Sequence, residues 1–175
     1  MGQDDLYREA VETFGSSLER LVGAYEFNPE KRRDLSQDIH FQLWRSFGQY
    51  DARCSLRTWI YRVAHHAAAS YVIRERRIFS TLVSLEELEF VPDHSTSSSA
   101  PDRRLNLDRL SALIQRLKPL DRQVIISYLE DMDAASIGEI TGLSPANVAM
   151  RIHRIKNVLA KRFHEGGREG GNDAR

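Results

Sequence analysis

The sequence of 175 residues has one cysteine, few prolines, no long apolar run and no net charge. Its single cysteine, Cys54, cannot form a disulfide within the chain, and a lone thiol is typical of a reducing cytoplasm. One cysteine also makes no zinc site of the usual Cys/His type unless several histidines lie beside it. No stretch reaches the roughly 20 consecutive apolar residues of a membrane span, and residues 1–12 lack the apolar core of a secretory signal. These absences predict a cytoplasmic protein that does not insert into a membrane.

Patterns typical of catalysis are also missing. No Ser/His/Asp arrangement, carboxylate pair or glycine-rich phosphate loop stands out. His65 and His66 would form a poor metal chelate, because adjacent residues on a helix point about 100° apart. Arg53 beside Cys54 leaves redox sensing as an alternative, although a plain loop thiol is the favoured interpretation. We therefore predict that the protein is not an enzyme and holds neither a cofactor nor a metal.

The zero net charge is the sum of segments of opposite sign. The 25 Lys and Arg residues balance the 25 Asp and Glu residues, which by itself argues against a nucleic-acid binder. However, residues 57–77 carry five arginines and one glutamate, and residues 144–164 carry five basic residues and no acid. Salt screens charges beyond roughly 8–10 Å, so the local charge governs attraction to phosphate. The two basic blocks are therefore candidate DNA-binding segments, and a pair of solvated helix faces is the alternative.

Apolar residues recur at three- and four-residue steps, which predicts helices, and no segment shows the convincing alternation of a strand. A polar stretch rich in serine and proline, residues 92–102, indicates a linker. We therefore predict an all-α protein of two small helical domains joined by a flexible linker. The predicted bounds are 1–81 for the first domain, 82–104 for the linker, 105–165 for the second domain and 166–175 for a disordered tail.

The second domain carries the pattern of a helix-turn-helix. A short helix over about residues 135–141 is followed by the turn Gly142–Leu143–Ser144 and by a helix that begins at Pro145. Ser144 suits the N-cap, and Gly138 lies where the two helices cross and a side chain must be small. The outward face of the following helix is basic and has no acid, which predicts a DNA-reading helix. An αα-hairpin whose basic face is only solvated is the alternative. Asp121 is predicted to be the N-cap of the helix that precedes this helix-turn-helix and carries Val124 to Leu129.

In the first domain, the helix after the Asn28–Pro29 break has acidic and amide side chains on one face beside a large aromatic residue. Such a face suits contact with a basic partner protein, whereas the alternative is a solvated helix with Trp44 in the core. The next helix, from about Ser55 to Phe79, interleaves aromatic residues with arginines. Bases stack on aromatic rings for about 1–3 kcal/mol each, so this helix fits single-stranded or distorted DNA. The alternative is that Trp59 and Tyr71 fill the core.

With these motifs in this order, the chain from Leu6 to Phe163 resembles bacterial sigma factors of the extracytoplasmic-function group. The run Asp34–Asp38 with Leu43–Trp44 is similar to the segment that binds the clamp of RNA polymerase. The run Ser55–Ala64 is similar to the segment that opens and reads the −10 element, and the run Gly142–Arg154 is similar to the −35 reader. The resemblance implies a promoter-specificity subunit that binds core RNA polymerase and promoter DNA, with an anti-sigma factor as a further partner.

The resemblance also implies three groups of site residues. The core polymerase-binding group is Asp34, Gln37, Asp38, Phe41 and Trp44. The −10 DNA-binding group is Arg57, Trp59, Arg62, His66, Arg74, Arg76 and Arg77, with the loop 49–54 as the pocket for a flipped-out base. The −35 DNA-binding group is Ser144, Asn147, Met150, Arg151 and Arg154.

The sequence departs from the family pattern at several of these positions. His65, His66 and Ser70 stand where Arg, Asn and Asp are usual, and Ala149 stands where a basic residue is common. These departures predict an altered base preference. Two alternatives to a sigma factor are a helix-turn-helix transcription regulator, whose first domain senses a signal or dimerises, and an adaptor that binds a partner without reading DNA. In the free protein, the acidic segments are further hypothesised to dock onto the basic blocks and mask them.

Overall fold

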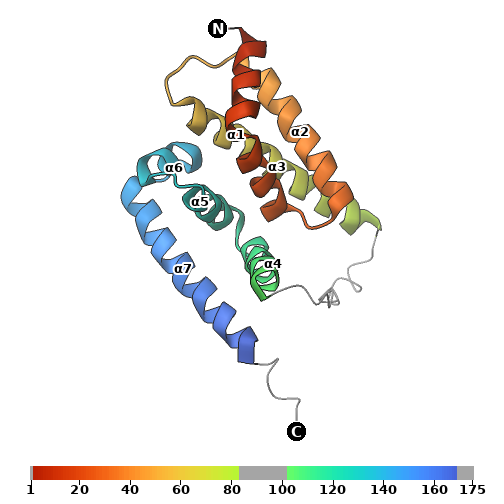
Figure 1. The fold of residues 1–175 in the computed structure, drawn as a ribbon, viewed down its shortest axis with the longest axis vertical. Coiled ribbons are helices and arrows are strands. Elements are labelled where there is room, and N and C mark those ends of the chain that lie inside the picture. The colour runs from red at the N-terminus through yellow and green to blue at the C-terminus, as the bar shows by residue number, and fades with distance from the viewer. Residues whose placement is uncertain (1, 83–101, 169–175) are drawn as a thin grey trace.

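The computed structural model describes the backbone of residues 2–82 and 102–168, and the side chains of residues 2–75 and 106–164. Within these ranges it contains α-helices and no strand, which confirms the predicted fold class. The first three helices form one bundle and the last four form a second bundle (Figure 1). The helices are α1 (Gln3–Tyr25), α2 (Pro29–Phe47), α3 (Leu56–Leu82), α4 (Asp102–Gln115), α5 (Pro119–Leu129), α6 (Ala134–Thr141) and α7 (Pro145–Arg168).

The first bundle follows from the apolar spacing and from the break at Asn28–Pro29. The side-chain oxygen of Asn28 accepts hydrogen bonds from the backbone amides of Glu30 and Lys31, at 2.9 and 3.2 Å, and Pro29 occupies the first helical position. This cap starts α2 directly after α1 and lets the two helices pack side by side on α3. The buried side chains recur at four-residue steps along α2, as expected for one inward face: Leu35, Ile39, Leu43 and Phe47.

The second bundle contains the predicted helix-turn-helix in α6 and α7. Gly142 has a φ of +76°, a left-handed conformation that suits a glycine at the end of α6. The hydroxyl of Ser144 accepts a hydrogen bond of 3.3 Å from the amide of Asn147, so it caps α7 as predicted. A Cβ atom on Gly138 would lie 2.6 Å from the carbonyl oxygen of Leu143, which confirms that the crossing requires a residue without a side chain.

The helices extend beyond several predicted bounds. The backbone of α3 continues to Leu82, α4 begins at Asp102 and α7 continues to Arg168. Three residues at the end of the predicted linker and the first three of the predicted tail are therefore helical. The remainder of the linker, 83–101, and of the tail, 169–175, lies outside the described residues.

The prediction that Asp121 caps α5 is wrong. Lys118 is the N-cap and Pro119 is the first helical residue, so Asp121 lies within the first turn of α5. Its carboxylate is nearly buried and points toward α7, where it accepts hydrogen bonds from Arg151 and Arg154. The carboxylate binds these two charged arginines instead of capping its own helix. A capping rule that considers only neighbouring residues does not include partners that lie so far along the chain.

The two bundles pack against each other. Helices α5 and α6 contact α3, and α4 contacts α1, so the second bundle lies along one side of the first (Figure 1). His65 of α3 and Ser127 of α5 are both fully buried at this junction. One face of the basic helix α3 is therefore covered by the other domain, as the masking hypothesis expects.

Candidate nucleic-acid interface

The predicted −10 residues of α3 lie on two different faces of the helix. Arg57 and Arg62 point toward the second bundle, where each donates a hydrogen bond to a backbone carbonyl oxygen. The acceptor for Arg57 is Glu130, and the acceptor for Arg62 is Glu139, at 3.1 Å. The structure therefore does not present these two arginines to solvent together with the rest of the group.

A second face of α3 is open to solvent. His66, Ser70 and Ile73 are exposed there, and Arg74 is exposed beside them. The guanidinium of Arg74 lies 5.4 Å from the ring centre of Tyr71 and forms an ion pair of 3.5 Å with Asp38 of α2. The backbone of Arg76 and Arg77 continues α3, whereas their side chains lie outside the described residues.

The aromatic residues of α3 mostly belong to the core. Tyr61 and Tyr71 are buried, so the alternative interpretation is correct for Tyr71. Trp59 is half-buried, and its indole N–H donates a hydrogen bond of 3.0 Å to the hydroxyl of Ser46. Its ring centre lies 5.4 Å from that of Tyr50 in the loop between α2 and α3. Trp59 therefore supports this loop.

The loop 49–54 is held by its own short-range contacts. The hydroxyl of Tyr50 donates a hydrogen bond of 2.9 Å to the carbonyl oxygen of Cys54, and Arg53 pairs with Asp51 at 2.9 Å. Ala52 has a φ of +59°, which is unfavourable for a residue with a Cβ atom. These contacts give the loop a defined shape beside Trp59.

The predicted −35 residues lie along the outward face of α7. Asn147, Met150 and Arg154 are exposed, and Met150 has the largest exposed fraction of the exposed large apolar residues, 71 %. Arg151 is partly buried because its guanidinium lies 2.5 Å from the carboxylate of Asp121. Arg154 shares the same carboxylate at 3.2 Å and keeps 61 % of its side chain exposed. Asp121 therefore ties the reading face of α7 to α5 while leaving Arg154 accessible.

The predicted polymerase-binding residues gather on the outer face of α2. Asp34, Gln37, Phe41 and Trp44 are exposed, and Asp38 is partly exposed. The exposed fraction is 53 % for Phe41 and 42 % for Trp44, so the alternative that placed Trp44 in the core is wrong. The indole N–H of Trp44 donates a hydrogen bond of 2.9 Å to Asp4 of α1, which fixes the ring at the edge of this face.

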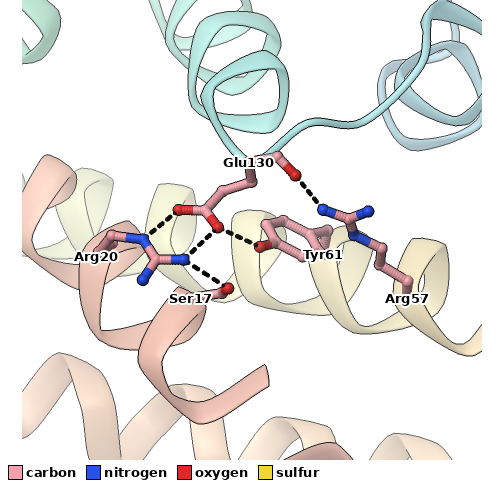
Figure 2. Close-up of polar contacts among 5 residues, drawn as sticks. All are labelled: Ser17, Arg20, Arg57, Tyr61 and Glu130. Atoms are coloured by element: carbon pink, nitrogen blue, oxygen red, sulfur yellow. Dashed lines mark hydrogen bonds and ion pairs between the residues drawn. The ribbon is translucent and has the colours of Figure 1, made fainter. Parts of the chain in front are cut away.

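A cluster centred on Glu130, at the end of α5, joins the two domains (Figure 2). Its carboxylate accepts two hydrogen bonds of 2.6 Å from Arg20 of α1 and one of 3.2 Å from the hydroxyl of Tyr61. Burial by itself raises the pKa of Glu130, but the hydrogen bonds and charge of Arg20 outweigh it, so the pKa lies below its ordinary value. The carboxylate is therefore ionised at neutral pH, as an ion pair across the junction requires.

His65 lies in the same junction. Its two ring nitrogens lie 3.0 Å from the hydroxyl of Tyr25 and 3.0 Å from that of Ser127. Burial lowers the pKa of His65 to about 3, because the charged ring would lose its water there. His65 is therefore a neutral part of the interface between the domains, and neither it nor Glu130 was a predicted site residue.

Neither a metal site nor a membrane-spanning helix is found in the part of the chain that the structure describes. Within the described ranges, no three His, Cys, Asp or Glu side chains lie together in a group that could hold a metal ion. The helices in these ranges are also too short or too polar to cross a membrane.

Two family profiles match the two domains in the order found here. The profile described as Sigma-70 region 2 matches residues 10–78, and that described as Sigma-70, region 4 matches residues 107–159. Together they cover more than two thirds of the chain. The protein therefore belongs to the sigma-70 family of RNA polymerase sigma factors, which are subunits that direct the start of transcription. Within that family it is an extracytoplasmic-function sigma factor, as the sequence motifs indicated.

Similar proteins agree with this assignment. RNA polymerase sigma factor YlaC of Bacillus subtilis (strain 168) is 24 % identical over 159 residues, which cover 90 % of each chain. ECF RNA polymerase sigma factor SigW of the same organism is 20 % identical over 172 residues, covering 94 % of this chain and 92 % of SigW.

Solved structures share the fold. CnrH, in complex with the cytosolic domain of CnrY, matches with a TM-score of 0.65 and 19 % identity, over 91 % of this chain and 88 % of CnrH. The sigma factor RpoE from Bartonella quintana, in complex with the anti-sigma factor NepR, matches with a TM-score of 0.69 and 17 % identity, over 90 % of this chain and 95 % of RpoE.

Proposed function

We propose that this sigma factor binds core RNA polymerase through the outer face of α2. The face combines the carboxylates of Asp34 and Asp38 with two exposed aromatic rings, Phe41 and Trp44. Exposed aromatic side chains on a polar surface are typical of anchors in protein interfaces, and acidic groups around them favour a basic partner. The exposed fractions of both rings are the observation that best supports this role.

The open face of α3 is proposed to contact the melted −10 element, with Trp59 and the loop 49–54 beside it. His66 and Arg74 offer polar and charged groups, and Arg57 and Arg62 would add to them once the second domain moves away. Asp is usual at the position of Ser70 in the family. Its absence removes a negative charge that would repel phosphate.

Helix α7 is proposed to lie in the major groove of the −35 element. Its outward face is exposed at Asn147, Met150 and Arg154, and its first turn carries no acid. Met150 would make apolar contacts in the groove, and Arg154 would reach a base or a phosphate. Ser144 caps the helix and holds its first turn in place.

The same proposal includes a non-enzymatic role in the cytoplasm and a further protein partner. Sigma factors act as specificity subunits, and the compartment is that of the polymerase. RpoE from Bartonella quintana is bound by the anti-sigma factor NepR in its solved complex. We propose that a partner of this class also regulates the present protein.

Run-off transcription with purified core polymerase tests the proposed function. Templates are promoter fragments from the genome that encodes the protein, and core polymerase alone is the control. We expect discrete transcripts only when the protein is added. If the protein neither joins core polymerase nor changes where transcripts begin, the proposed function is wrong.

A further inference from the structure

We propose that the Glu130 cluster is an intramolecular latch, in which residues 127–139 cover the Arg57 and Arg62 face of α3 and withhold it from DNA. The proposal rests on the proposed role of α3 in binding the −10 strand. The occupant of this face is a segment of the chain itself, from the end of α5 to the middle of α6.

The latch joins two helices of the first domain, α1 and α3, to Glu130 of the second domain (Figure 2). Arg20 donates two hydrogen bonds to the Glu130 carboxylate and a third, of 2.8 Å, to Ser17. The Glu130 side chain is only 9 % exposed, whereas that of Arg20 is 60 % exposed. Charge-assisted hydrogen bonds with this two-point geometry are stronger than neutral ones and are specific in direction.

Arg57 and Arg62 of α3 both form hydrogen bonds with the segment 127–139. Arg57 donates to the carbonyl oxygen of Glu130, and Arg62 donates to the carbonyl oxygen of Glu139. An N–H group bonded to a carbonyl oxygen is not available to a phosphate oxygen. Both arginines are only partly exposed beside the second domain, so a strand that binds both of them in full requires that domain to move.

The closed arrangement leaves buried hydrogen-bond donors of Arg57 and Arg62 without a partner among the described residues. Within the described part of the chain, the Nε groups of Arg57 and Arg62 are buried without a hydrogen-bond partner. A buried donor that lacks a partner is unfavourable, and opening would return both groups to water or phosphate. The −35 face remains uncovered, since Asn147 and Met150 are exposed in the same structure. The latch therefore separates the two DNA contacts and leaves the −35 contact available first.

The test compares two glutamates of the second domain. Glu130→Gln removes the charge that holds Arg20, and among the described residues the hydrogen-bond partners of the Glu130 carboxylate, Arg20 and Tyr61, lie in the first domain. Glu139→Gln is the matched control, because it changes the net charge equally while the backbone carbonyl that binds Arg62 remains. Helix content measured by circular dichroism should be the same for both variants and the unmodified protein.

Domain separation is measured by energy transfer between dyes on the exposed positions Thr13 of α1 and Ala160 of α7, both changed to Cys in a Cys54→Ser chain. Strand binding is measured with a labelled single-stranded DNA of mixed sequence, since phosphate contacts do not depend on sequence. We expect Glu130→Gln to lower the energy transfer and to tighten strand binding about tenfold, as release of a mostly closed population would do. Glu139→Gln should match the unmodified protein in both measurements.

Unchanged energy transfer in Glu130→Gln would overturn the latch and leave the sigma function intact. Reduced energy transfer without tighter strand binding would also overturn it, because the uncovered arginines would then not be the withheld contacts. Adding Arg57→Ala to Glu130→Gln should abolish most of the gain in strand binding. If the gain in strand binding persists when Arg57→Ala is added, both the proposed role of α3 and the latch are contradicted. The energy transfer reports domain separation independently of strand binding.

Discussion

The imidazole of His65 lies 3.0 Å from the hydroxyl of Ser127. A residue of the basic helix α3 in the first domain is therefore buried against, and hydrogen-bonded to, a residue of the second domain. On its other side the ring lies 3.0 Å from the hydroxyl of Tyr25. A neutral imidazole has one donor and one acceptor, and each hydroxyl can take either role. The ring is therefore satisfied while it is neutral, and burial makes its charged form unfavourable.

This relationship predicts that acid weakens the folded protein. The groups around His65 are Tyr25 of α1, Tyr61 of α3 and Ser127 of α5, with the guanidinium of Arg122 lying 5.3 Å from the Tyr25 ring centre. Because the folded pKa is lowered to about 3, the contribution of neutral His65 is present above about pH 6.5 and is lost as the pH falls. We expect the free energy of unfolding to fall by about 1.4 kcal/mol in total between pH 7.5 and 5.5, measured by urea unfolding.

The control for this prediction is His65→Gln, which keeps a polar side chain and removes the titration. The exposed neighbour, His66→Gln, serves as the matched substitution. The pH dependence should disappear in the first variant and persist in the second. The same pH dependence in His65→Gln would show that another group causes it.

The helix-turn-helix should not tolerate a methyl group at Gly138. A Cβ atom there would lie 2.6 Å from the backbone carbonyl oxygen of Leu143, and backbone cannot move aside cheaply. We expect Gly138→Ala to destabilise the protein by about 1–3 kcal/mol. Gly15→Ala, in the middle of α1, has nothing within 4 Å of the added atom and should be neutral or stabilising. Thermal unfolding of the two variants compares them directly, and equal melting temperatures would contradict the crossing geometry.

Arg154 is expected to carry part of the −35 affinity. Its side chain is 61 % exposed on the outward face of α7. Its hydrogen bonds to the Asp121 carboxylate are long, at 3.2 and 3.4 Å, so they are weak enough for a DNA contact to replace them. Arg154→Ala should weaken binding to the −35 duplex by about 1–3 kcal/mol in a fluorescence anisotropy titration. Lys156→Ala is the control, because that ammonium lies 5.5 Å from the ring centre of Tyr128 and faces α5. An equal loss in both variants would indicate charge attraction without a specific contact.

Phe41 is expected to anchor the protein on core polymerase. Its ring is 53 % exposed on α2 and lies under the guanidinium of Arg45, at 5.6 Å. Phe41→Ala should reduce the affinity for core polymerase by about 1–2 kcal/mol, since truncated aromatic anchors typically cost this much or more. Leu107→Ala, at an equally exposed apolar position in the second domain, should have a smaller effect. The reverse order would move the contact away from α2.

The sequence was sufficient for the features that depend on local chemistry. The break at Asn28–Pro29, the turn at Gly142–Ser144 and the close crossing at Gly138 are all consequences of neighbouring residues, and the structure has each of them. The family motifs likewise identified the class of protein. The helical period places Phe41 away from the apolar face of α2, whereas it places Trp44 between the two faces and leaves the exposure of that ring open.

The contacts between the domains could not be predicted residue by residue. Glu130 and Arg20 are 110 positions apart, and the sequence offers many other acids and arginines of similar exposure. The segment charges indicated masking in general, but not which carboxylate performs it. Asp121 shows the same difficulty, because its partners on α7 become apparent only when α5 and α7 are packed together.

The most direct measurement for the central claim is a footprint of the complete polymerase on one promoter. Core polymerase with the protein should protect the −35 element and make thymines in the −10 element reactive to permanganate, which attacks unpaired bases. Core polymerase alone should do neither. Protection and melting that are the same with and without the protein would contradict the assignment of these two domains to promoter recognition.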